Sequence, residues 1–213
     1  MAKPETKDQI LDAAEDLFAE QGFAATSMRQ ITSLAQVNLA AVNYHFGSKE
    51  ELAKAVLRRR IEPINAERGR RLDQLDDQAT ISAIVRAFIE PALQIQRASP
   101  DAEPTSRAAG LCRLFGRISV EQPPFLREFV GEQFGELGIR FVAVLSKASP
   151  GVAAETLWWR MHFMIGALSH TLQNSHILEQ ASGGACDVTD HDTILARLTA
   201  FAIGGFSTTE ASR

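Results

Sequence analysis

The stretch NLAAVNYHFGSKEEL, Asn38 to Leu52, decides the fold of this chain. It predicts a helix of about two turns that begins after a capping asparagine, Asn38, and ends at Gly47. Ser48 and Glu51 then form a capping box that starts another helix. A helix this short gains little stability by itself. Its outward polar side chains therefore favour a role in binding.

The residues before this stretch predict two more helices. Apolar residues of the first recur at the spacing of one helix face: Ile10, Ala13, Ala14, Leu17 and Phe18. Gly22 is placed to end that helix in the left-handed conformation. Ser27 and Gln30 form a capping box for a second short helix. A tight turn then leads to Asn38, so the second and third helices have the arrangement of a helix-turn-helix.

The third helix has two distinct faces. On a helical wheel Val42, Phe46 and Leu39 share one side, which we expect to pack inward. Small Ala40 on the other side permits close approach to a DNA groove, and the Asn43 amide matches adenine in the major groove. Alternatively, His45 only caps helix carbonyls and Tyr44 only packs between helices. The predicted DNA-contacting residues are Thr26, Ser27, Arg29, Asn38, Leu39, Ala40, Asn43, Tyr44, His45 and Lys49.

Residues 7–60 resemble the DNA-binding domain of TetR-family transcriptional regulators. The resemblance is carried by ILDAAEDLFAEQGFAATSMRQIT and by AQVNLAAVNYHFGSKEEL. Most members of that family have tyrosine at the position of Asn43, so the amide here favours base reading over a phosphate contact. The VNYHFGSKE variant and the later GLCRLFGRISVEQPPF are similar to the fatty-acid-responsive repressors of the family.

The rest of the chain predicts an all-α protein. Helical periodicity covers residues 80–97, 107–120, 124–147, 152–177 and 191–206, separated by stretches rich in turn-forming residues. Proline predicts a kink or break in two helices, at Pro63 and Pro91. We expect a helix-turn-helix domain at residues 1–50, a connecting helix from about residue 49, and a larger helical domain at residues 51–213.

For the larger domain, the resemblance implies a small-molecule pocket and a homodimer formed through the last two helices. An apolar cleft with few charged groups suits a fatty acid or an acyl thioester. Alternatively, the apolar residues only form the core and the arginines lie at the surface with snorkelling stems. The predicted pocket residues are Phe88, Arg113, Arg117, Phe129, Phe134, Trp158, His162 and Phe163.

Composition and motifs limit the other classes of function. The formal charge of -4 argues against a nonspecific polycation. No membrane-spanning segment, apolar leader or metal-type cysteine spacing is seen, so we expect a cytoplasmic protein without a cofactor. Phosphate-loop, zinc-protease, serine-hydrolase and dinucleotide motifs are also absent, which argues against an enzyme. A cluster near the C-terminus admits a metal site, although an aspartate N-cap explains its acidic residues: Cys186, Asp187, Asp190, His191 and Asp192.

The sequence therefore predicts a transcriptional regulator, a repressor that a small apolar effector releases from a palindromic operator. The effector is expected to be a long-chain fatty acid or acyl-CoA. Two alternatives remain open at this stage. The same fold can act by binding a protein partner without reading DNA, or it can respond to an unrelated hydrophobic or xenobiotic ligand.

Overall fold

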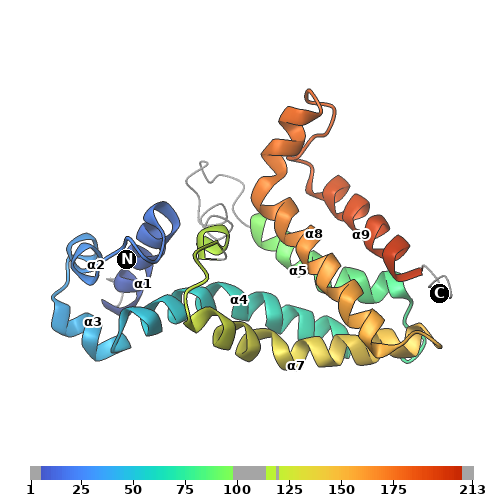
Figure 1. Ribbon diagram of the computed structural model, residues 1–213, viewed down its shortest axis with the longest axis horizontal. Helices are drawn as coiled ribbons and strands as arrows, with labels where there is room; N and C mark the ends of the chain where they lie inside the picture. Colours follow the sequence, from blue (N-terminus) through green and yellow to red (C-terminus); the bar gives the residue numbers. More distant parts are fainter. Residues whose placement is uncertain (1–5, 98–113, 119, 208–213) are drawn as a thin grey trace. The chain divides into compact units, whose positions relative to one another are not determined.

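The computed structural model of the protein describes residues 6–97, 114–118 and 120–207. Within these ranges every regular element is helical, so the all-α prediction is confirmed (Figure 1). The helices are α1 (Thr6–Gln21), α2 (Met28–Ala35), α3 (Leu39–Phe46), α4 (Lys49–Asp73), α5 (Ile81–Arg97), α7 (Phe125–Ala148), α8 (Ala154–Ala181) and α9 (His191–Ser207). Most of the predicted 107–120 helix lies outside the described residues, and residues 114–118 are helical.

The chain divides into two compact units. Unit 1 comprises residues 1–63 and 101–133, and unit 2 comprises residues 64–100 and 134–213. Helices α4 and α7 each contribute residues to both units. This division differs from the functional boundary expected near residue 50, because the first part of α4, up to Pro63, belongs to unit 1. The expected functional boundary itself stays a prediction.

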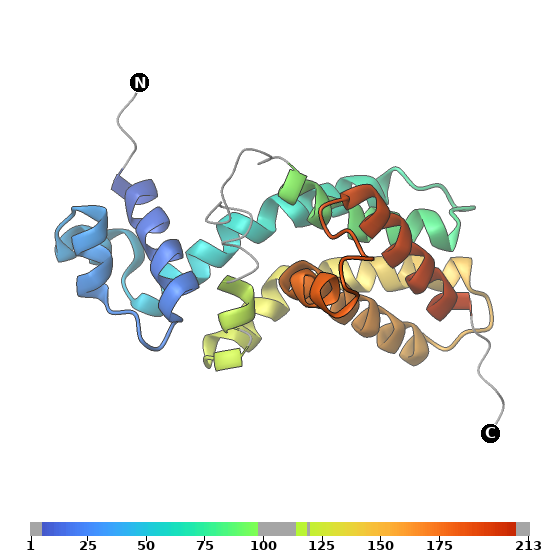
Figure 2. The ribbon, with the colours of Figure 1, turned by 90° about the horizontal axis from the view of Figure 1, so that it is seen from above.

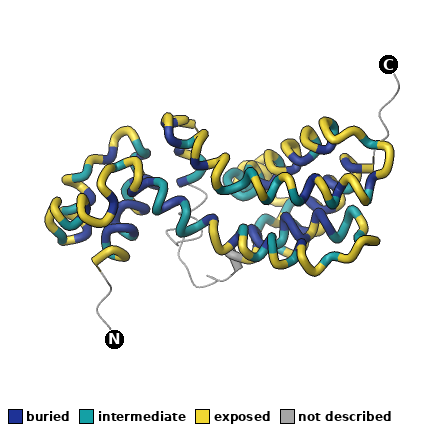
Figure 3. Tube along the Cα trace, turned by 90° about the horizontal axis from the view of Figure 1, so that it is seen from below, coloured by how far each residue is buried: buried dark blue, intermediate teal, exposed yellow. Residues whose placement is uncertain are grey.

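Unit 1 has a small core in which α1 packs against α2 and α3, and α2 against α3. Ile10, Phe18, Ile31 and Val42 are fully buried there, and Figure 3 shows buried residues on the inner sides of these helices. Gly22 ends α1 with φ +88°, as predicted from its position, and its N–H donates to Phe18 O. The short helices are thus stabilised by a shared apolar centre rather than by their own length.

A buried carboxylate joins α1 to α4 in unit 1. Glu15 is only 4% exposed, and Arg59 Nη2 donates to its Oε2 at 2.6 Å. Arg60 Nε donates to the same carboxylate at 2.9 Å, and Arg59 Nη1 also reaches Asp12 at 2.8 Å. Burial opposes the charge on Arg59, but hydrogen bonds and the charges of Glu15 and Asp12 outweigh it and raise the pKa of Arg59.

In unit 2, α9 packs against both α5 and α8 (Figures 1 and 2). The α8 side chains that face inward form an apolar stripe: Leu157, Met161, Met164 and Leu168. On α5, Phe88 lies edge-on to Phe141 of α7, with ring centroids 5.1 Å apart. The α8 stripe therefore belongs to the core of the protomer, and a surface for a partner has to come from other residues.

Most predicted helix ends are confirmed to within a few residues. The helices continue through Pro63 and Pro91, so neither proline breaks its helix. α8 extends beyond the predicted residue 177 and has non-helical backbone angles at Asn174. Within the ranges that the structure describes, no helix is long and apolar enough to cross a membrane.

Candidate nucleic-acid interface

Helix α2 begins and ends as its sequence predicts. Ser27 Oγ accepts from the Gln30 N–H, and the Ser27 N–H donates to Gln30 Oε1 at 2.7 Å, which is the expected capping box. The helix ends at Gln36 in the left-handed conformation, with φ 55°. This left-handed residue makes the tight turn that leads into α3.

Helix α3 is anchored at its start and along one face. Asn38 Oδ1 accepts from the Ala41 N–H at 2.7 Å, so Asn38 is the N-cap as predicted. Val42 and Phe46 are buried, as expected for the inward face. Leu39 is 44% exposed, and its predicted inward packing is wrong. Leu39 is the first residue of the helix, where the three-helix core no longer covers it.

The outward face of α3 is a short row of exposed side chains. Ala40, Asn43 and His45 are all exposed, and Tyr44 is 87% exposed. Such exposure is incompatible with Tyr44 packing between helices, which was the alternative explanation for this residue. The Tyr44 and His45 rings lie 5.2 Å apart, edge to face. The face thus offers an amide, a hydroxyl and an imidazole beside one small residue, on a rigid base of Val42 and Phe46.

The predicted DNA-contacting residues around the start of α2 differ from one another in exposure. Thr26 is buried, and its hydroxyl donates to Gly22 O at 2.7 Å and to Leu17 O at 3.2 Å. Its side chain therefore caps the end of α1, which corrects the predicted side-chain contact with DNA. Ser27 and Arg29 are exposed as predicted.

Lys49 begins α4 but turns back towards the loop between α1 and α2. Its Nζ lies 4.4 Å from the centre of the Phe23 ring and donates to Ala24 O at 3.4 Å. Burial lowers the pKa of Lys49, and the charge of Glu121 acts in the opposite direction. Ser48 Oγ accepts from the Glu51 N–H, which forms one half of the predicted capping box. Lys49 is thus placed beside the loop that leads to Ser27.

Sequence reasoning missed Glu121. Its Oε2 accepts from the Ala24 N–H at 2.8 Å, and its Oε1 would lie 1.8 Å from a Cβ on Gly22. Glycine is favoured at position 22, because the backbone angle strains other residues and a Cβ there would displace the Glu121 carboxylate from Ala24. The sequence carried no local signal of this contact, since the two partners are 97 residues apart.

A second candidate surface lies on α8 and α9 in unit 2. A groove of about 560 Å³ runs there, with Arg160 Nη1 donating to Phe206 O at one side at 2.8 Å. The rings of Trp159 and Phe163 stack at 5.8 Å, and Phe201 is 68% exposed. The groove is lined by Thr156, Trp159, Arg160, Phe163, Met164, Phe201, Ala202, Gly205 and Phe206.

The predicted pocket residues fall in several different places. Phe88 is buried in the core of unit 2, and Phe129 is fully buried in unit 1. Phe134 is half-buried, and Arg117 is exposed. Phe163 lines the groove just described, whereas Trp158 and His162 are exposed on α8 beside it. Arg113 lies outside the described residues.

In the polar cluster before α9, an aspartate is the N-cap of the helix, as the sequence suggested. Asp190 Oδ1 accepts from the Asp192 N–H at 3.0 Å and from the Thr193 N–H at 3.1 Å. Hydrogen bonds from Thr189 lower the pKa of Asp187. Asp190 is therefore the cap, and the residues that the structure describes contain no grouping of three or more side chains suited to hold a metal ion.

Comparison with known proteins identifies both parts of the chain. Residues 10–56 match the family described as bacterial regulatory proteins, tetR family. Residues 86–205 match the tetracyclin repressor-like, C-terminal domain. The second match alone spans more than half of the chain, and the first contains α2, the turn and α3.

The most informative relatives are transcriptional repressors. The HTH-type repressor NicS of Pseudomonas putida is 40% identical over 85 residues, or 39% of this chain and 40% of NicS. Repressor Rv3405c of Mycobacterium tuberculosis is 51% identical over 55 residues, or 26% of this chain and 29% of that protein. The matched stretches thus span less than half the length of these relatives. The structure of fatty acid degradation regulator FadR from Bacillus halodurans has a TM-score of 0.67 at 14% identity, covering 98% of this chain and 100% of that one.

Proposed function

The chain belongs to the TetR family of helix-turn-helix transcriptional regulators, which are not enzymes, and from that premise we propose that it is a ligand-released repressor. In this proposal α3 reads a palindromic operator in the major groove, and a small apolar effector releases it. The observation that carries the proposal is the outward face of α3. Its exposed Asn43 and Tyr44 stand on the buried Val42 and Phe46.

Each exposed group on this face has a chemical role in the proposal. Asn43 reads adenine, because its amide offers one donor and one acceptor side by side. Tyr44, His45 and Arg29 donate to phosphates on either side of the groove. Ser27 and Lys49 stand at helix N-termini, where backbone N–H groups attract a phosphate.

Two half-sites of a palindrome require two copies of the chain, so we propose a homodimer through α8 and α9. The exposed aromatic residues there support it, because a monomer rarely keeps such a patch in water. The partner surface in this proposal is made of Trp159, Phe163 and Phe201 rather than of the buried α8 stripe.

The effector proposal starts from acyl compounds, long-chain fatty acids and acyl-CoA. FadR is described as a regulator of fatty acid degradation, and its fold matches along nearly the whole chain. In this mechanism the effector favours a conformation in which the two α3 helices no longer fit their half-sites. To release the operator it must prefer that conformation by several kcal/mol.

The first experiment selects fragments of genomic DNA with the purified protein, with and without a panel of acyl compounds, and sequences what is retained. We expect an enriched palindrome that is lost when one acyl compound is added. A palindrome that is indifferent to every acyl compound contradicts the acyl proposal and leaves room for another hydrophobic ligand. Absence of any enriched sequence contradicts operator reading and points to a protein-binding regulator.

Variants then test the interface residue by residue. Asn43→Ala should relax preference at one base position of each half-site, because one bidentate contact is worth about 1–3 kcal/mol. Lys49→Ala should weaken binding to all DNA sequences alike. It should also reduce the salt dependence of the DNA affinity by about one phosphate contact. Gln74→Ala, which removes an exposed amide of unit 2, is the control and should bind as the wild type does.

The dimer proposal has its own test. Phe201→Glu places a charge in the α8–α9 patch and should convert the dimer to monomers in analytical ultracentrifugation, with loss of operator binding. Ile139→Glu changes an equally exposed apolar residue of α7 and should leave the dimer intact. A Phe201→Glu protein that remains dimeric would place the dimer interface elsewhere.

A further inference from the structure

Arg68 of α4 is a buried cation in unit 2. It is only 5% exposed, and its guanidinium lies over the Phe88 ring, 3.9 Å from the ring centre. Arg68 Nε donates to Phe88 O at 2.8 Å, and Nη1 donates to Asn65 Oδ1 at 3.1 Å. Both acceptors are neutral. A charged group that is removed from water normally requires an opposite charge.

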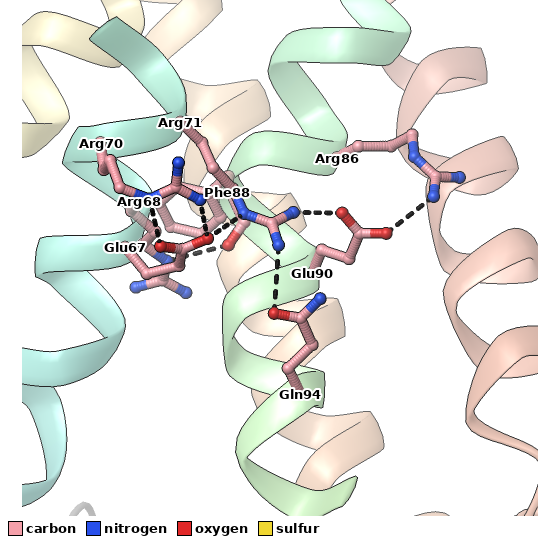
Figure 4. Close-up of polar contacts among 8 residues, drawn as sticks. All are labelled: Glu67, Arg68, Arg70, Arg71, Arg86, Phe88, Glu90 and Gln94. Carbon is pink, nitrogen blue, oxygen red and sulfur yellow. Dashed lines mark hydrogen bonds and ion pairs between the residues drawn. The ribbon is translucent and has the colours of Figure 1, made fainter. Parts of the chain in front are cut away.

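The neighbouring arginines show that carboxylates are available close by (Figure 4). Arg70 and Arg71 both donate to Glu67, and Arg71 and Arg86 both donate to Glu90. Arg68 bonds neither of these two carboxylates. Within the described part of the chain it forms no ion pair. Burial alone lowers the pKa of Arg68 to about 9, so the side chain is still charged at neutral pH.

A structural role accounts for part of this arrangement. Pro91 has no N–H, so the α5 turn around Ala87 and Phe88 lacks one helix hydrogen bond. The carbonyl that lacks its donor is Ala87 O, four residues before Pro91, whereas Arg68 Nε donates to the neighbouring Phe88 O and thereby joins α4 to this turn. That role uses one of the five N–H groups of a guanidinium and needs no charge. It leaves the positive charge facing the Phe88 ring and without a carboxylate partner.

Part of the Arg68 guanidinium makes no hydrogen bond within the described residues. Of the five N–H groups, one bonds Phe88 O and one bonds Asn65, so three remain. Within the described residues, some fully buried side-chain polar atoms have no hydrogen-bond partner: Arg59 Nε, Ser149 Oγ and Thr199 Oγ1. Arg68 Nη2 bonds neither acceptor and is not among these atoms, so this nitrogen is not fully enclosed by the protein.

We propose that Arg68 binds the carboxylate of the effector, which is therefore a free organic acid with an apolar body. The inference rests on the proposed function and names the chemistry of its effector. A carboxylate accepts two parallel N–H bonds from a guanidinium and neutralises it. The buried aromatic rings of Phe88 and Phe141 beside it require that the rest of the molecule be apolar. A thioester carbonyl carries no charge, so a coenzyme A thioester would leave Arg68 uncompensated.

Calorimetric titration of the full-length protein at neutral pH tests this assignment. The probes are hexanoic, octanoic, decanoic, dodecanoic and phenylbutyric acids, the primary alcohol of each, and the coenzyme A thioester of octanoic acid. The proteins are the wild type, Arg68→Met and Arg70→Met. Arg70 is the matched control, because it is an exposed arginine two residues away whose only role here is a surface pair with Glu67.

We expect at least one acid to bind the wild type about tenfold or more tightly than its alcohol, as a charge-assisted hydrogen-bond pair gives. Arg68→Met should remove that preference and Arg70→Met should keep it. Should Arg68→Met fail to fold, Arg68→Lys should still prefer the acid, because it keeps the charge. Equal binding of acid and alcohol, tighter binding of the thioester, an unchanged preference in Arg68→Met, or no binding of any acid to the wild type overturns the inference.

Operator selection in the absence of effector separates this inference from the proposed function. A protein that enriches a palindrome but is indifferent to the acids keeps the repressor proposal and loses the role of Arg68. A protein that binds an acid through Arg68 but enriches no DNA keeps the role of Arg68 and loses the repressor proposal.

Discussion

Two buried charged residues, one in each unit, have different surroundings. Glu15 of unit 1 and Arg68 of unit 2 are 4% and 5% exposed. Both Glu15 oxygens accept from arginine side chains of α4, whereas within the described residues Arg68 bonds a backbone carbonyl and a side-chain amide and lies over an aromatic ring. At nearly equal burial, Glu15 therefore has opposite charges beside it and Arg68 is bonded to none.

The difference separates a structural charge from one available for binding. The Glu15 cluster is closed in charge, since Glu15 and Asp12 face Arg59 and Arg60, and it joins α1 to α4, although Arg59 Nε has no hydrogen-bond partner. A cluster closed in this sense lacks no counter-charge for a ligand to supply. The Arg68 site lacks one component, an anion, and an anion that enters it gains an interaction that the free protein does not make.

The largest expected effect is on the closed cluster. Glu15→Ala should lower the free energy of unfolding by about 3–5 kcal/mol in urea titrations, because Arg59 and Arg60 lose their buried partner. Asp12→Ala is the matched control on the same helix and should cost less than about 1 kcal/mol, since Asp12 is 43% exposed. If both variants lose the same amount, the burial of Glu15 is not what distinguishes the cluster.

A smaller effect should appear in the pH dependence of stability. The folded protein releases the Arg68 proton above a pKa of about 9, because burial lowers the pKa of this guanidinium, whereas the unfolded chain keeps the proton to a much higher pH. Between these values the unfolded state binds more protons, so stability rises with pH. Wild-type stability relative to Arg68→Met should rise by about 1.4 kcal/mol from about pH 8 to about pH 10. A flat or falling difference would mean that a counter-charge is already present.

The smallest effect is expected for the open site in the absence of ligand. Arg68→Met loses one hydrogen bond to Phe88 O but also removes an uncompensated charge, so the two contributions oppose each other. The free energy of unfolding at neutral pH should change by less than about 1 kcal/mol. A loss as large as that of Glu15→Ala would show that Arg68 is as structural as Glu15.

Local sequence signals were sufficient for the helix ends of unit 1. The cap at Asn38, the capping box at Ser27 and the end of α1 at Gly22 each depend on a few adjacent residues, and each is confirmed. The errors occur where packing decides. The wheel treats Leu39 as if its helix continued beyond both ends, and it has no means of showing that the Thr26 hydroxyl turns inward to α1.

The contacts that join residues far apart in the sequence determine the rest of the structure, and they were not predicted. Glu15 meets its arginines 44 and 45 residues away, and Arg68 meets Phe88 at a separation of 20. One signal for Arg68 was nevertheless present in the sequence. It lies on a stripe with Ile61, Ile64 and Leu72 at helical spacing, all of them buried, whereas Arg70 lies off that stripe. An arginine in register with apolar residues is the pattern to look for.

The exposed face of α8 has a practical consequence for spectroscopy. The chain contains two tryptophans, Trp158 and Trp159, and both are exposed on the same turn of that helix. Trp159 lines the α8–α9 groove, whereas the Trp158 ring lies close to Gly138 of α7. Intrinsic tryptophan emission therefore includes a contribution from the proposed partner surface through Trp159. Dilution of the protein should shift the emission to longer wavelength as the Trp159 indole returns to water, so subunit association can be followed without a label.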